Sequence, residues 1–304
     1  MSITILKGDV VSAPALGQLD TTEQGYLVAE DGVIQGVFPA LPERYAGAPV
    51  EDWGRALILQ SLADLHLHAP QYPLMGTGMD LPLLEWLNAY AFPTEARYAD
   101  PDYAREVYRL LSRDLAACGT TRVCMFSSLH TDATLILMEE LEKAGITGFV
   151  GKVNMDRNSP DYLRETSAEE SAKATRAWIQ AVAERHYERV QPILTPRFTP
   201  SCSDELMELL HGIQKETGLP VQSHLSENPG EIAWVQELCP WSEFYGDAYD
   251  HFGMFGGECR TIMAHCVYSG EEEIQRMKEH GVFIAHCPES NTNLSSGVAP
   301  VRRY

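Results

Sequence analysis

The sequence has no apolar run near the roughly 18 residues that a membrane-spanning helix requires, and no charged-then-apolar secretory signal at its N-terminus. Its seven cysteines are scattered and include no Cys-x-x-Cys pair, which favours reduced thiols over a disulfide framework. Basic residues are few, since 23 Lys and Arg face 43 Asp and Glu for a formal charge of −20. This charge disfavours nucleic acid and anionic membranes as partners. We therefore expect a cytoplasmic protein.

Several catalytic motifs are absent as well. The sequence has no Gly-x-Ser-x-Gly elbow, no Walker-type phosphate loop and no Gly-x-Gly-x-x-Gly after a strand, so esterase, kinase and dehydrogenase chemistry lose their main support. The tripeptide His186-Tyr187-Glu188 matches half of the cytidine-deaminase zinc signature, but the Pro-Cys-x-x-Cys half is missing and the tripeptide falls on an amphipathic helical stretch. We assign it no role.

The chain is long enough for one large domain or two modest ones, because 304 residues with 44% hydrophobic side chains can bury a full core. Residues 1–56 carry short alternating runs broken by turn signals such as Asp31-Gly32, which predicts a small antiparallel, sandwich-like β domain. Residues 57–304 alternate brief apolar runs with helical stretches, the pattern of parallel strands and crossover helices. We expect strands near residues 57–67, 121–126, 148–153, 190–195, 220–225, 261–265 and 282–286.

These seven strand–helix repeats approach the eight of a (β/α)8 TIM-like barrel, whose catalytic groups lie at the C-terminal ends of the strands. A doubly wound open sheet is the alternative. Gly119 is expected to end one amphipathic helix, and Asp132 to N-cap the next. Capping-box spacing predicts helix starts at Ser167 and at Ser269, each with a glutamate three residues later.

Two histidines mark the end of the first barrel strand. Side chains alternate across a strand, so His66 and His68 project from the same face and could each offer a ring nitrogen to one divalent metal ion. The alternative is a pair of inward-facing histidines that are satisfied by hydrogen bonds. His224 and His265 end the fifth and sixth strands, so four imidazoles are expected at one rim.

Glu227 lies three residues after His224 and just before a Pro-Gly turn, which places a carboxylate at the same rim. It is a candidate proton shuttle, or else an exposed loop carboxylate or a helix-start charge. Gln71, Arg197 and Phe198 together suit a flat heteroaromatic ligand, because an amide, a guanidinium and a phenyl face can grip and stack on it. Considered one by one, each is better explained by structure than by function, as a turn residue, a surface ion-pair residue and a core aromatic respectively.

The Asp-x-His-x-His strand, the later strand-end histidines and His286-Cys287-Pro288 resemble the metal-dependent amidohydrolase superfamily. Within it the chain is similar to the guanine deaminase family from about residue 57 onward. The blocks that carry this resemblance are His68-Ala69-Pro70-Gln71-Tyr72, Asp80-Leu81-Pro82-Leu83-Leu84-Glu85-Trp86-Leu87, Phe92-Pro93-Thr94-Glu95, Thr195-Pro196-Arg197-Phe198 and Ser223-His224-Leu225-Ser226-Glu227-Asn228.

The resemblance implies hydrolytic deamination of guanine to xanthine and ammonia, in purine catabolism. It also implies a homodimer when the protein is full length. It implies that one zinc ion per subunit activates a water, although imidazole ligands suit iron as well. The implied roles are metal binding by His66, His68 and His224, acid–base catalysis by Glu227 with His265 beside the water, and purine binding by Gln71, Trp86, Arg197 and Phe198. Deamination or dechlorination of another heterocycle, and a non-catalytic metal-binding remnant, are the alternatives.

The sequence departs from this family in two places. Gln60-Ser61-Leu62-Ala63 stands where a Pro-Gly entry to the first strand is usual, and no residue can be assigned to the family's metal-site aspartate after the eighth strand. We therefore expect a barrel that is incomplete at its C-terminus, with low activity and a tendency to associate through its exposed strand edges.

Overall fold

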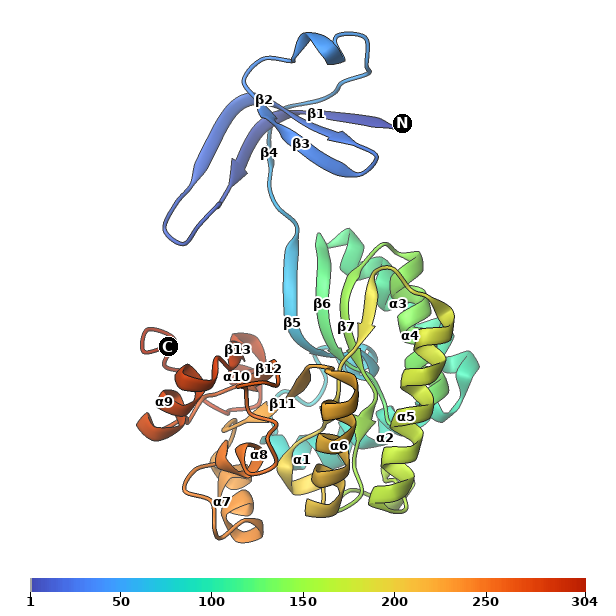
Figure 1. The fold of residues 1–304 in the computed structure, drawn as a ribbon, viewed down its shortest axis with the longest axis vertical. Helices are drawn as coiled ribbons and strands as arrows, with labels where there is room; N and C mark the ends of the chain where they lie inside the picture. Colours follow the sequence, from blue (N-terminus) through green and yellow to red (C-terminus); the bar gives the residue numbers. More distant parts are fainter. Residues whose placement is uncertain (1) are drawn as a thin grey trace. The chain divides into compact units, whose positions relative to one another are not determined.

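The computed structural model describes residues 2–304 and divides the chain into two compact units, one ending at Leu62 and one running from Ala63 to Tyr304 (Figure 1). The first unit contains one sheet in the order β3-β2-β1-β4. Its strands are β1 (Ile3–Ser12), β2 (Asp20–Glu30), β3 (Val33–Phe38) and β4 (Glu51–Ile58), with a 3-10 turn at Glu43–Tyr45. Ile5, Val28 and Tyr45 form its small core.

Local turn chemistry builds the first unit only in part. Asp31 and Gly32 have φ values of 47° and 80°, the left-handed conformations of a two-residue hairpin turn, and they join β2 to β3 as an antiparallel pair. However, β4 pairs with β1 in parallel, so the prediction of a purely antiparallel unit is wrong. The reason is that a segment of 12 residues (39–50) separates β3 from β4, long enough to return the chain to the same end of the sheet.

The second unit is built from parallel strands that follow one another in chain order. The first sheet has the order β5-β6-β7-β9 and the second β11-β12-β13, while an isolated parallel bridge joins Leu194 to Val221 between them. The short strands β8 and β10 pair in parallel where β7 and β9 are interrupted. The strands are β5 (Leu62–His68), β6 (Thr120–Phe126), β7 (Thr147–Gly151), β8 (Val153–Asn154), β9 (Val190–Pro192), β10 (Thr195–Pro196), β11 (Val221–Leu225), β12 (Thr261–His265) and β13 (Phe283–Ala285).

This consecutive order is that of a barrel, whereas a doubly wound sheet reverses its strand order partway. The predicted barrel-type fold is confirmed, and its strands lie close to the predicted positions. One strand differs: the run expected at 57–67 is broken at residues 59–61, so its first part belongs to β4 and its second to β5.

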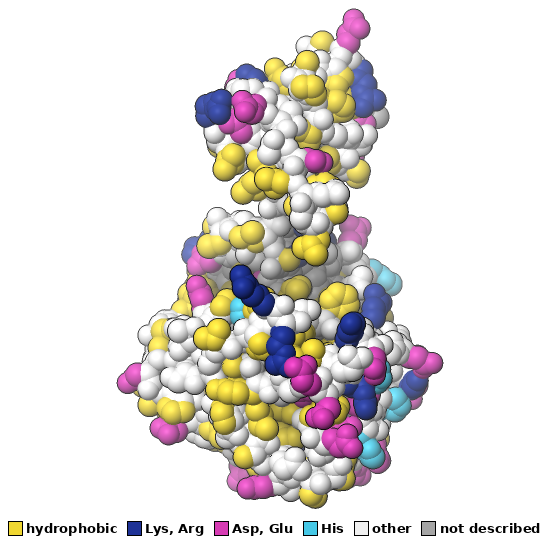
Figure 2. All heavy atoms as spheres, turned by 90° about the vertical axis from the view of Figure 1, so that its left-hand side faces the viewer, with side chains coloured by type: hydrophobic (Ala, Val, Ile, Leu, Met, Phe, Trp, Pro, Cys, Tyr) yellow, Lys and Arg dark blue, Asp and Glu magenta, His cyan; other side chains and the backbone are white. Residues whose placement is uncertain are grey.

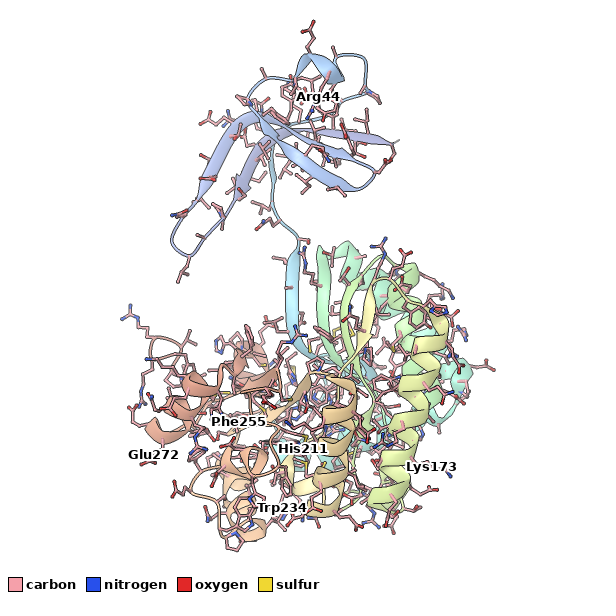
Figure 3. The ribbon with its side chains drawn as sticks, viewed as in Figure 1. Arg44, Lys173, His211, Trp234, Phe255 and Glu272 are labelled. Carbon is pink, nitrogen blue, oxygen red and sulfur yellow. The ribbon has the colours of Figure 1, made fainter. Side chains whose placement is uncertain are left out.

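Helices connect the strands. The long ones are α3 (Pro101–Ala117), α4 (Thr131–Lys143), α5 (Ala168–Arg185), α6 (Asp204–Thr217), α7 (Pro229–Leu238) and α9 (Glu271–His280), and the short ones are α1 (Leu83–Trp86), α2 (Phe92–Ala96), α8 (Asp247–Asp250) and α10 (Pro288–Asn293). Short 3-10 or π turns lie at Ala69–Leu74, Leu87–Ala91, Arg97–Ala99, Asp161–Leu163 and Thr199–Ser201. In Figure 3, Lys173 of α5 and Glu272 of α9 lie on outer helices, whereas Phe255 lies in the core.

The helix caps test the predicted boundaries. Ser167 accepts a hydrogen bond from the Glu170 N–H at 3.2 Å, as the capping box predicts, and α3 ends shortly before Gly119. The other two caps are wrong. Helix α4 begins at Thr131 after His130, so Asp132 lies in its first turn, where a negative charge still suits the helix dipole. Helix α9 starts after Gly270 rather than at Ser269, with three glutamates in its first turn.

Other sequence predictions concern the surface and the cysteines. All seven cysteines are free thiols, five of them buried, and among residues 2–304 no helix is both long and apolar enough to cross a membrane. The tripeptide at His186 lies just beyond α5 rather than on it, because His186 adopts the left-handed conformation that ends that helix. Acidic side chains are scattered between basic and hydrophobic ones on the face of the second unit seen in Figure 2.

Candidate metal centre and active site

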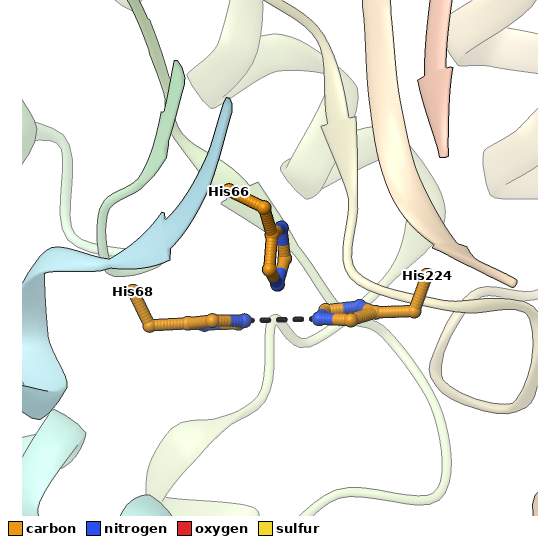
Figure 4. A group of neighbouring side chains, drawn as sticks. All are labelled: His66, His68 and His224. Atoms are coloured by element: carbon orange, nitrogen blue, oxygen red, sulfur yellow. Dashed lines mark hydrogen bonds between the residues drawn. The ribbon is translucent and has the colours of Figure 1, made fainter. Parts of the chain in front are cut away.

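Three histidines from two strands converge at the C-terminal ends of the barrel strands. His66 and His68 leave the same face of β5, and His224 leaves β11 (Figure 4). One ring nitrogen from each lies within 4.8 Å of the others, and the Nε2 atoms of His68 and His224 are 2.9 Å apart. The His66 ring stands nearly perpendicular to both, at centroid distances of 5.1 Å from His68 and 4.9 Å from His224. The alternation of β5 thus produces the geometry that the sequence predicts.

The chemistry of these nitrogens fits a metal ion. His224 Nδ1 lies 2.5 Å from the Arg197 carbonyl oxygen, and because a carbonyl accepts, Nδ1 carries the proton and Nε2 presents a lone pair toward His68. His68 Nδ1 is buried without a hydrogen-bond partner. Burial lowers the pKa of all three imidazoles well below the usual value, and their neighbours' charges add to this effect. The three rings are therefore neutral at pH 7, as metal binding requires.

A second group shares His66. His66, His265 and Cys287 also place one ligand atom each within 4.8 Å of one another. Sequence reasoning gave Cys287 no role, although its place two residues after β13 was a usable signal. Burial raises the pKa of its thiol to about 12, so in the metal-free protein Cys287 is a neutral thiol. The adjacent His286 is exposed and lines a separate shallow cavity.

Glu227 and His265 form the next part of the site. His265 Nδ1 lies 2.7 Å from Asn291 Oδ1, so it donates to that oxygen, and Nε2 faces Glu227 Oε2 at 3.5 Å. Burial lowers the pKa of His265 and raises the pKa of Glu227 to about 8. A carboxyl that holds its proton thus faces an imidazole lone pair. His265 has a φ of 75°, and such strain in a non-glycine residue is typical of functional sites.

A further buried carboxyl, Glu231, was not singled out from the sequence. It accepts hydrogen bonds from the Tyr245 hydroxyl at 2.7 Å and from the Glu227 backbone N–H at 3.3 Å. Burial, together with the charge of Glu227, raises the pKa of Glu231 to about 7. Its position four residues after Glu227, at the start of a helix, was the available signal. We call His66, His68, His224, His265, Glu227 and Glu231 the catalytic wall.

Glu95, Gln71 and Arg197 form a second wall, which we call the arginine wall. Arg197 Nη1 and Nη2 donate to Glu95 Oε2 and Oε1 at 2.5 and 2.9 Å, and Gln71 Nε2 donates to Glu95 Oε1 at 2.9 Å. Glu95 lies in one of the sequence blocks described above, but it carried no predicted role because a lone glutamate gives no local signal of burial.

The catalytic wall lines one cavity of about 230 Å³, and so do Gln71 and Arg197 of the arginine wall, with Glu95 behind them. Trp86, held by a hydrogen bond from its Nε1 to the Thr77 carbonyl at 2.9 Å, and Phe198, edge-on to the His224 ring, add aromatic surface. The cavity brings together every candidate residue that the sequence suggested: His66, His68, Gln71, Trp86, Arg197, Phe198, His224, Glu227 and His265.

Comparison with known proteins identifies the family to which this fold and cavity belong. The amidohydrolase family model matches residues 57–304, and the chain belongs to this family of metal-dependent enzymes. The resemblance to guanine deaminases is also confirmed. The chain is 39% identical to the guanine deaminase of Dictyostelium discoideum, over 99% of this chain and 70% of that protein. It is 47% identical to the guanine deaminase of Mus musculus, over 80% and 53% respectively.

A solved structure also supports the resemblance to guanine deaminases. The chain superposes on the guanine deaminase of C. acetobutylicum, which holds guanine in its active site, with a TM-score of 0.95 and 46% identity, covering 100% of this chain and 72% of that one. The chain thus spans between 53% and 70% of the length of the two curated relatives named above.

Proposed function

We propose that this chain carries the catalytic site of a guanine aminohydrolase, which converts guanine and water to xanthine and ammonia. The observation that carries the proposal is the cavity itself, in which three neutral histidines, an acid–base pair and the arginine wall face one another. The amidohydrolase match and the guanine deaminase relatives support the same reaction.

The proposed metal is zinc, held by His66, His68 and His224. Their convergence and their neutral state both fit a divalent cation. When bound, zinc would acidify water toward a pKa of about 7 and so make hydroxide available at neutral pH. Metal analysis of the chain purified without added metal tests this choice; iron in place of zinc would overturn it.

The roles of the other residues follow from their donors and acceptors. Arg197 donates to the ring carbonyl O6, and the faces of Phe198 and Trp86 cover the planar rings. In the reactive state the proton shared by Glu227 and His265 lies on His265 Nε2, which donates to the oxygen on which charge develops, and Glu227 is ionised. Glu227 then takes one proton of the attacking water and delivers it to the ring nitrogen, and afterwards carries the second proton of that water to the departing amine. A C2–O bond forms, the bond from C2 to the exocyclic nitrogen breaks, and ammonia leaves.

The test compares rings and one substitution. Guanine, cytosine, a pterin and a triazine are each supplied to the zinc-loaded chain, with binding and ammonia release measured in parallel; we expect guanine to be preferred in both. Glu227→Gln should lower ammonia release by at least ~100-fold and leave guanine binding in place, whereas Glu237→Gln, an exposed glutamate of α7, should change neither. Preference for another ring, or zinc binding without any purine binding, would overturn the proposal.

Three further expectations from the sequence are proposals too. They are the division into a β domain (1–56) and a barrel (57–304), a homodimer for the full-length protein, and a cytoplasmic location. Limited proteolysis tests the first, light scattering the second and cell fractionation the third. The domain division would be contradicted if the protease cut inside the barrel sooner than at the 56–57 boundary. A monomer would contradict the homodimer, and recovery in another compartment would contradict the cytoplasmic location.

A further inference from the structure

Glu95 lies behind two residues that we propose to touch the purine. Among the described residues that line the cavity, Gln71 and Arg197 are present and Glu95 is not. The three come from distant segments: the turn after β5, helix α2, and the segment that follows β10. The side chains of Glu95 and Arg197 are each 2% exposed. One carboxylate thus holds both polar groups that the cavity presents on this side.

The Glu95 carboxylate determines which way the Gln71 amide faces. An ionised carboxylate only accepts hydrogen bonds, so the atom of Gln71 that lies 2.9 Å from Glu95 Oε1 is the donor Nε2. The amide oxygen Oε1 lies in the same plane as Nε2 but on the opposite edge of the amide group, away from this contact with Glu95. Rotating the amide by 180° would set oxygen against oxygen and would lose this charge-assisted hydrogen bond.

The same carboxylate orients the Arg197 guanidinium. Two of its five N–H groups are committed to Glu95 in a bidentate pair, and the guanidinium carbon stacks over the Phe92 ring at 5.1 Å. Phe92 is itself buried in the cluster that contains Leu83 and Leu87. The remaining N–H groups can therefore donate only in a fixed direction, and the opposite charges of Glu95 and Arg197 cancel.

We propose that Glu95 is a positioning residue that sets ring specificity, by holding the Gln71 amide oxygen as an acceptor beside the Arg197 N–H donors. This inference rests on the proposed function. An acceptor beside a donor, with no net charge, complements a neutral cyclic amide, in which a ring N–H adjoins a carbonyl. Guanine has this edge at N1 and C6. In 2,6-diaminopurine the edge is reversed, because N1 accepts and the 6-amino group donates.

The experiment measures the dissociation constants of guanine and 2,6-diaminopurine on the same zinc-loaded chain. The wild type should prefer guanine by at least ~100-fold, since a site built for hydrogen bonds rejects a ligand that leaves them unpaired. In Glu95→Gln the neutral amide can donate as well as accept, so the Gln71 amide can turn over. The preference should then fall at least ~10-fold, with zinc content unchanged.

The matched control is Glu85→Gln, which makes the same change at an exposed glutamate of the neighbouring helix α1 and should keep the wild-type preference. If Glu95→Gln does not fold, Glu95→Asp keeps the charge but shortens the arm, and the same loss of preference is expected. A wild-type preference in a folded Glu95 variant overturns this inference alone. A wild type that binds neither purine overturns the proposed function instead.

Discussion

The two walls of the cavity bury polar side chains in different ways: one buries a pair of opposite charges, and the other buries neutral groups. In the arginine wall, Glu95 and Arg197 form a nearly inaccessible ion pair in which both carboxylate oxygens are hydrogen-bonded. In the catalytic wall burial keeps the side chains neutral, because imidazole pKa values are lowered and carboxyl pKa values are raised, and the Nε2 atoms of His68 and His224 face each other at 2.9 Å. Folding alone therefore satisfies the charges of the arginine wall, whereas the ring nitrogens of the catalytic wall are left to bind a ligand.

The largest effect is expected when the positive charge of Arg197 is removed from the arginine wall. Arg197→Met leaves the Glu95 carboxylate buried, with Gln71 as its remaining donor, and breaking a buried pair from one side costs about 3–5 kcal/mol. We expect a loss of that size in the free energy of unfolding, measured with urea. Arg197→Met/Glu95→Leu removes both charges and should recover most of the loss. A double variant as unstable as the single one would show that the pair is not the cause.

The second change acts on the catalytic wall, where the loss should appear in metal binding rather than in folding. His66 belongs to both candidate ligand groups, so His66→Ala disrupts each of them. Zinc affinity should fall by more than the 10–100-fold that outer partners of a metal site typically cost, while stability of the metal-free chain changes little. Competition with a chromogenic chelator measures the affinity, and His286→Ala is the control because His286 is exposed. Unchanged affinity in His66→Ala would place the metal elsewhere.

The two walls also differ in how far the sequence could predict them. The strand-end histidines were predictable because period-two alternation and the barrel rule together fix where His66 and His68 point. Glu95 was not, because its burial depends on Arg197, 102 residues away in the chain. The parallel pairing of β4 with β1 was not predicted for the same reason, because it joins segments that are distant in the sequence. The predicted N-caps at Asp132 and Ser269 were wrong because a helix can start one or two residues away at little cost in free energy.

The smallest expected effect is a pH dependence of the free energy of unfolding that arises from Glu231 in the catalytic wall. Burial raises the pKa of Glu231 to about 7, above the 4.3 typical of an unfolded chain. Between these values the folded state binds more protons, so this group makes stability fall as pH rises from about 4.5 to 7, with no further loss above. Glu231→Gln removes the titration, and its amide oxygen can still accept from the Tyr245 hydroxyl.

The variant should therefore gain stability relative to the wild type as the pH is raised from 5 to 8, by about 2–3 kcal/mol, since close to two pKa units are titrated in this range and each corresponds to about 1.4 kcal/mol. Urea unfolding of the metal-free proteins at pH 5, 6.5 and 8 measures this difference. The neighbouring histidines titrate in both proteins, so their contribution largely cancels. Glu237→Gln on the same helix should give no trend, because that glutamate is exposed. A difference for Glu231→Gln that stays constant with pH would mean that this carboxyl ionises as freely as one in solvent, and that the catalytic wall is not held neutral by burial.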